Sequence, residues 1–201
     1  MINDINFYIK STLAGIFIAM GAIVSLSIGW PIGPFLFSFG LIFIILTQTN
    51  LFTGKSGFTK NWNDTLMLPI MLLCNIFGCY LLSLLFPLLD TSAIVRNRLC
   101  STYTEIFCYS ILTGIIMTVA VYYAKEKNNW LPLLIGIPTF IFSGLPHCIA
   151  DAFYYFNFEV SWRIIKIWLL SVAGNYVGCN FHRILNLDFM KNTSKNSIIN
   201  K

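Results

Sequence analysis

Long apolar stretches separated by short polar segments dominate the sequence. The first of them, residues 11–54, contains no Asp, Glu, Lys or Arg. As a single helix it would extend roughly 66 Å at about 1.5 Å per residue, twice the roughly 30 Å of a bilayer's hydrocarbon core. The WPIGP segment at residues 30–34 interrupts it, because two prolines and a glycine remove helical hydrogen bonds. The stretch therefore predicts two membrane spans, Ser11–Gly29 and Phe35 to about Leu51.

Four further uncharged stretches follow, and three of them are long enough to cross a bilayer. The last stretch is shorter, and it reaches spanning length if Arg163 and Lys166 lie at its interfacial end, beside Trp162 and Trp168. Together these patterns predict an all-α integral membrane protein with six transmembrane helices. The four later spans are Thr65–Leu89, Ile106–Ala124, Asn128–Ala150 and Ile167–His182.

Composition supports a membrane protein and excludes several other classes. The chain is 57% hydrophobic and 10% charged, whereas soluble domains carry about 25% charged residues. A soluble enzyme and a disordered protein are both disfavoured by these values. The net charge of +5 comes from 13 basic and 8 acidic residues, which are too sparse to follow a phosphate backbone, so no nucleic-acid partner is expected.

The basic residues predict the orientation in the membrane. With both termini cytoplasmic, nine basic residues lie inside and four outside, as the positive-inside rule requires. We therefore expect a multi-pass protein of the inner or plasma membrane. We expect residues 1–186 to form one membrane domain and residues 187–201, which are rich in Asn, Ser and Lys, to form a flexible cytoplasmic tail. The inside set is Lys10, Lys55, Lys60, Lys125, Lys127, Arg183, Lys191, Lys195 and Lys201, and the outside set is Arg96, Arg98, Arg163 and Lys166.

A weak internal repeat relates the two halves of the chain. The segment NIFGC at Asn75–Cys79 in the third span recurs as NYVGC at Asn175–Cys179 in the sixth. With three spans in each half, the second half is inverted relative to the first, as in many transporters and channels. The same spacing of small and polar residues is also explained by close helix packing alone.

The second and fifth spans are interrupted at corresponding places. Polar residues and glycines occupy Thr47–Gly57, and Pro138 and Ser143–Cys148 interrupt the fifth span in the same way. Irregular backbone at membrane depth occurs only where it is buried in protein or lines a cavity. Both breaks are therefore expected to face the interior of the molecule.

Four motifs in order resemble the formate/nitrite transporter (FNT) family. They are GLIFIILTQTNLFTGK at residues 40–55, CNIFG at 74–78, SGLPHCIADAFY at 143–154 and GNYVG at 174–178. The resemblance runs from about Thr12 to Leu185. It implies an aquaporin-like inverted 3+3 repeat with broken second and fifth helices, a pore in each protomer and a ring of five protomers. It also implies passage of small monovalent anions such as formate, nitrite or hydrosulfide.

The resemblance assigns roles to individual residues. The family's central pore histidine falls on His147, and the threonine of the broken second helix falls on Thr53. Asn75 and Asn175 are placed in the same pore, and Arg98 corresponds to a basic residue at its outer mouth. Two apolar constrictions are expected to bracket His147: Leu41, Leu51 and Phe52 on the cytoplasmic side, and Phe37, Met117 and Phe140 on the outer side. The sequence departs from the family pattern at Pro146, Gly114 and Asp151.

The chemistry of histidine agrees with this assignment. An ionisable side chain inside a membrane is costly and by default indicates a pathway. An anion in an apolar constriction loses its hydration, whereas the neutral acid loses little. A proton exchanged with His147 would convert the anion into the acid. The expected partners are thus a small monovalent anion, a proton and the lipid bilayer.

Two other classes of function remain open from the residues alone. A pore for ammonium or a neutral solute would share the span count and a pore histidine. An integral-membrane enzyme would need clustered acids, bases or metal ligands, and the eight acidic residues are scattered. The six cysteines contain no Cys-x-x-Cys pair, so neither a metal nor another cofactor is expected.

Overall fold

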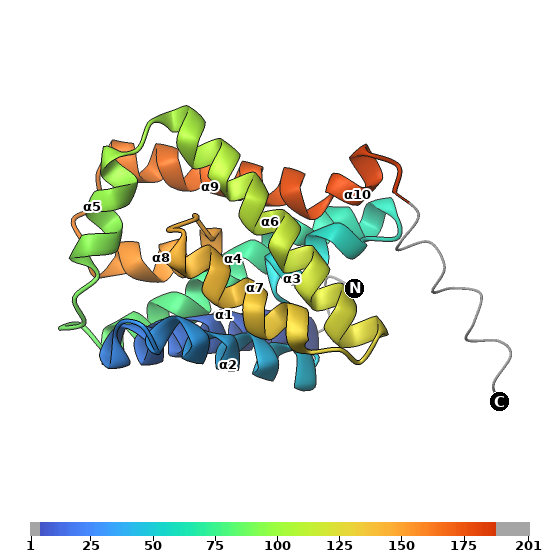
Figure 1. The fold of residues 1–201 in the computed structure, drawn as a ribbon, viewed down its shortest axis with the longest axis horizontal. Coiled ribbons are helices and arrows are strands. Elements are labelled where there is room, and N and C mark those ends of the chain that lie inside the picture. The colour runs from blue at the N-terminus through green and yellow to red at the C-terminus, as the bar shows by residue number, and fades with distance from the viewer. Residues whose placement is uncertain (1–4, 188–201) are drawn as a thin grey trace, which may run out of the picture.

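The computed structural model describes residues 5–187, and this part of the chain is built from helices without a β-strand. The predicted tail lies outside the described residues, apart from Leu187. Figure 1 shows the course of the chain. The helices are α1 (Ile5–Ile28), α2 (Gly33–Leu46), α3 (Phe52–Lys55), the 3-10 helix η1 (Ser56–Phe58), α4 (Trp62–Leu85), α5 (Ser92–Cys100), α6 (Tyr103–Glu126), α7 (Leu131–Phe142), α8 (Cys148–Phe156), α9 (Trp162–Cys179) and α10 (Phe181–Ile184).

Four long helices correspond to the first, third, fourth and sixth predicted spans. Helices α1, α4 and α6 each have 24 residues and are apolar enough to cross a membrane. Helix α9 has 18 residues, or about 27 Å at about 1.5 Å per residue. The predicted ends shift: α1 begins at Ile5, ahead of the exposed Lys10. Helix α4 ends at Leu85, because Pro87 disfavours helical backbone at Phe86, whose φ and ψ are −128° and 54°.

The second and fifth spans are broken, as the sequence predicted. Helices α2 and α3 are separated by residues 47–51, and α7 and α8 by residues 143–147. The predicted end of the fifth span at Ala150 is wrong, because α8 continues to Phe156. Asp151, at which the uncharged stretch stops, is buried within α8. Hydropathy predicts the end of a span at the first charged residue. It does not detect an oppositely charged side chain that stabilises the buried carboxylate within the protein.

The two halves of the chain pack in corresponding ways. Helix α1 packs along α4 and α2, and α6 packs along α9 and α7, while α2 and α7 contact each other across the halves. Each short helix also contacts a long helix of the other half of the chain: α3 contacts α6, and α8 contacts α4. In Figure 1, α3 and α8 lie in the middle of the molecule, between α1 and α2 below and α6 and α9 above. This arrangement brings both helix breaks into the interior.

Glycines in the repeated motif allow the long helices to approach closely. A Cβ atom on Gly78 of α4 would collide with the carbonyl of Thr12 in α1, and one on Gly178 of α9 would collide with the carbonyl of Ile111 in α6. Such small residues let two helix backbones touch, which is the packing explanation of the repeat. The glycines of the repeat therefore have a packing role in both halves.

Candidate functional site

A buried asparagine holds the first helix break. The Oδ1 atom of Asn75 accepts a hydrogen bond of 2.8 Å from the backbone N–H of Phe52, the first residue of α3. Its Nδ2 atom donates to the carbonyls of Ser11, at 2.6 Å, and Asn50, at 2.9 Å. Asn75 thus links α1, the break and the start of α3 from its place in α4.

Asn175 does the same at the second break. Its Oδ1 atom accepts from the N–H of Cys148, the first residue of α8, at 2.8 Å. Its Nδ2 atom donates to the carbonyls of Ser110 at 2.8 Å and Pro146 at 3.1 Å. Both asparagines were predicted to line the pore. In the structure the amide nitrogen and the amide oxygen of each side chain form hydrogen bonds with backbone groups. Their visible role is to fix the two breaks.

The two breaks bring His147 and Thr53 together. His147 is the residue before α8, Thr53 lies in α3, and 2.9 Å separates His147 Nε2 from Thr53 Oγ1. Both side chains are buried, with 1% and 0% of their surface exposed. Residues 94 positions apart in the sequence thus form a polar pair within the apolar interior. This pair was predicted from the resemblance alone, and the fold places its members in contact.

The hydrogen bonds of the imidazole define its tautomer. The Nδ1 atom accepts from the N–H of Ala150 at 3.2 Å and caps the first turn of α8. A ring nitrogen that accepts from an amide carries no proton, so the proton of the neutral ring is on Nε2. His147 therefore donates to Thr53 Oγ1. The hydroxyl hydrogen of Thr53 has no acceptor within the described part of the chain, and it is available to a ligand.

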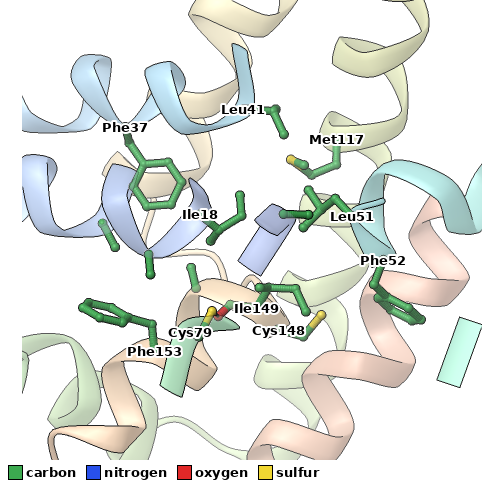
Figure 2. Close-up of a cluster of buried hydrophobic side chains, with 14 of the residues drawn as sticks. Ile18, Phe37, Leu41, Leu51, Phe52, Cys79, Met117, Cys148, Ile149 and Phe153 are labelled. Atoms are coloured by element: carbon green, nitrogen blue, oxygen red, sulfur yellow. Dashed lines mark hydrogen bonds between the residues drawn. The ribbon is translucent and has the colours of Figure 1, made fainter. Parts of the chain in front are cut away.

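Apolar side chains surround this polar pair. All six residues of the predicted constrictions are buried, with 1% to 4% of their surface exposed. The ring of Phe140 stacks on the imidazole of His147, with centroids 5.7 Å apart at 22°, and meets the ring of Phe37 edge-on at 6.1 Å. Figure 2 shows five of the six in the buried cluster: Phe37, Leu41, Leu51, Phe52 and Met117.

Two cavities lie toward opposite ends of α4. The first, of about 330 Å³, is lined by the first turns of α4 and by Asn50 and Lys55. The second, of about 280 Å³, is lined by Arg98 of α5, the helix after α4, and by Phe140 and His147. His147 and Phe140 thus line the second cavity directly, and neither lines the first. His147 is therefore reached from the second cavity.

The site offers hydrogen-bond donors and no ready metal ligands. Within residues 5–187, no three His, Cys, Asp or Glu side chains are grouped so that they could hold a metal ion. The Nδ1 atom of His147 already accepts from an amide, and Nε2 faces a hydroxyl. The geometry suits a small ligand that accepts hydrogen bonds.

A comparison with protein-family models decides the family. The model described as "Formate/nitrite transporter" matches residues 3–181. The chain belongs to the formate/nitrite transporter family. It is therefore a multi-pass membrane protein of a family of channels and transporters, and an enzyme is excluded. A search of curated proteins found no match.

Solved structures share the fold of this FNT protein. The chain is similar to an "FNT family ion channel" with 20% sequence identity and a TM-score of 0.77, covering 92% of this chain and 89% of that one. It is also similar to a "Pentameric formate channel with formate bound", with 17% identity and a TM-score of 0.74, covering 90% and 94% of the two chains. At these identities the likeness establishes the fold.

Arg98, predicted at the outer mouth of the pore, lines the second cavity of this FNT protein and is paired with an acidic residue. Its side chain is 7% exposed and forms an ion pair of 3.3 Å with Asp151 of α8. Asp151 also lines this cavity. From the sequence it was identified only as a position that differs from the family pattern. The available signal was an acidic residue four positions after His147, which is one helical turn along the broken fifth span.

Proposed function

We propose that this FNT protein is a channel or transporter for small monovalent anions of the formate, nitrite or hydrosulfide class. We further propose that it moves the anion together with a proton by way of His147. The observation that supports this most directly is the His147–Thr53 pair, a buried polar site between two sets of apolar side chains.

The apolar constrictions favour a neutral form of the substrate. A bare anion between Leu and Phe side chains loses its hydration without compensation, and burial of an isolated charge is very unfavourable. Beside His147 the anion meets the Thr53 hydroxyl and the Nε2–H group as donors. The polar pair therefore supplies hydrogen bonds where the path is otherwise apolar.

Proton exchange takes place between His147 and the bound anion. An imidazolium gives its Nε2 proton to an oxygen of formate, which leaves formic acid and a neutral imidazole that carries its proton on Nδ1. Formation of the imidazolium requires a proton on Nδ1, which displaces the Ala150 amide from that atom. The charged ring is thus a transient state. The resting form, capped by the Ala150 amide, returns when Nε2 takes up a proton and Nδ1 releases its own. Only the neutral acid then has to cross the second constriction.

Orientation and assembly belong to the same proposal. We propose that both termini are cytoplasmic, with the Lys55 cavity inside and the Arg98 cavity outside, because the distribution of basic residues favours this orientation. A homopentamer with one pore per protomer is favoured by the resemblance, and a solved structure of the same fold is described as pentameric.

Flux measurements in proteoliposomes test the proposal. The purified protein is compared with protein-free liposomes for uptake of formate, nitrite, hydrosulfide, acetate, lactate, ammonium and glycerol, with a pH dye inside. We expect uptake of the small anions with proton entry, and little uptake of lactate. Uptake of only ammonium or glycerol would instead assign the pore to another solute class.

A further inference from the structure

The most unusual polar contact outside the His147–Thr53 pair is the ion pair between Arg98 and Asp151. It joins α5 to α8, with 7% of the Arg98 side chain and 1% of the Asp151 side chain exposed. Nε of Arg98 donates to both carboxylate oxygens at 3.4 and 3.3 Å, and Nη2 donates to Oδ1 at 3.4 Å. Two buried charges of opposite sign thus lie in direct contact.

The remaining bonds of Arg98 tie it to the second helix break. Its Nη1 atom donates to the carbonyl of Gly144 at 2.5 Å, and Nη2 donates to the carbonyl of Leu145 at 3.1 Å. Both carbonyls belong to the segment that ends at His147. Four of the five N–H groups of the guanidinium are therefore directed at protein oxygens, which fixes its position.

The Arg98–Asp151 pair lines the cavity through which an anion would reach His147 in the proposed function. Arg98 and Asp151 line the same cavity of about 280 Å³ as His147 and Phe140. An anion entering from this cavity is attracted by the guanidinium and repelled by the carboxylate. Since the two charges are in contact, their effects on an anion nearly cancel.

We propose that Asp151 sets the anion affinity of this cavity by cancelling the charge of Arg98. The inference depends on the proposed function, since it concerns the anion that the pore carries. A cavity with a paired arginine admits an anion without retaining it, so the pore saturates only at high anion concentration. Asp151 is thus a residue that determines affinity, and Arg98 both positions the break and supplies the charge that is cancelled.

Replacement of Asp151 by Asn separates the charge from the shape of the site. Asn retains an oxygen that accepts from Arg98, while the guanidinium charge loses its compensation. We expect the half-saturating formate concentration of Asp151→Asn to fall roughly tenfold, the size of effect that one uncompensated charge produces at a few ångströms. The maximal formate flux should fall as well, because a retained anion leaves slowly.

The double variant Arg98→Gln/Asp151→Asn is the matched control, because it removes both charges and keeps amide groups at both positions. We expect its half-saturating concentration to lie roughly tenfold above that of Asp151→Asn, because the tighter binding in the single variant depends on the uncompensated guanidinium. A folded double variant with the same half-saturating concentration as Asp151→Asn would overturn the proposal. An unchanged half-saturating concentration in folded Asp151→Asn would overturn it too. Asp151→Ser, which also removes the carboxylate, takes the place of Asp151→Asn if that variant does not fold. Absence of formate flux in the parent would instead refute the proposed function.

Discussion

Removal of the amide of Asn175 tests whether the second break is held as the structure indicates. The Asn175→Ala variant loses one acceptor and one donor group that together make three hydrogen bonds, to Cys148, Ser110 and Pro146. All three partners are backbone groups, and the side chain of Asn175 is fully buried.

The magnitude follows from the number of groups left without a partner. A buried polar group that loses its hydrogen bond costs about 1 to 3 kcal/mol. The amide of Cys148 and the carbonyl of Pro146 lose the one hydrogen-bond partner that each has among the described residues, whereas the carbonyl of Ser110 lies within α6. We therefore expect Asn175→Ala to lower the free energy of unfolding by about 3 to 5 kcal/mol.

Ser171 supplies the control on the same helix. It lies one turn before Asn175, is 1% exposed, and its Oγ atom has no hydrogen-bond partner among the described residues. Ser171→Ala should therefore change the free energy of unfolding by less than about 1 kcal/mol. Both variants are compared with the parent by denaturant unfolding in detergent. Equal stability of the two variants would refute the role given to Asn175.

Three further predictions concern the pore and its orientation. Phe140→Ala should raise lactate flux more than formate flux, because it opens an apolar constriction. The control Phe39→Ala, which removes a ring that contacts Phe43 within α2, should not have this effect. Equal effects of Phe140→Ala on both anions would mean that Phe140 only packs against its neighbours and does not select the anion. Thr53→Val should lower formate flux, since it removes the hydroxyl donor beside His147. It should also lower the free energy of unfolding by about 1 to 3 kcal/mol, because the Nε2–H group of His147 loses its acceptor. Unchanged flux would remove Thr53 from the site. A single cysteine at Arg96 should react with an impermeant reagent outside sealed cells, and one at Lys125 should not; the opposite pattern would reverse the orientation.

Much of this fold is predictable because its signals are local. The breaks follow from glycines, prolines and polar residues within apolar stretches, and the structure has them at residues 47–51 and 143–147. The equivalence of Asn75 and Asn175 is also visible in the sequence as a repeated motif. What the motif does not contain is the identity of the bonded groups, because these are backbone atoms from distant helices that carry no sequence signal.

The charged part of the site was harder to predict for a physical reason. Hydropathy treats Asp151 as the end of a span, yet the carboxylate stays within α8 because Arg98 neutralises it from α5. The two residues are 53 positions apart, and only the packing of α5 against α8 brings them into contact. Arg98 was therefore predicted only as a basic residue at the outer mouth of the pore, and its partner was not predicted.

The most direct test of the central claim is formate uptake by His147→Asn in proteoliposomes at several pH values. Asn is among the best residues for capping a helix N-terminus, so α8 should keep its cap and the protein its fold. We predict that proton-coupled formate uptake disappears or loses its dependence on pH, because the variant has no group that exchanges a proton with the anion. A folded His147→Asn protein with the parent's rate and pH profile would contradict the account and make His147 a structural residue.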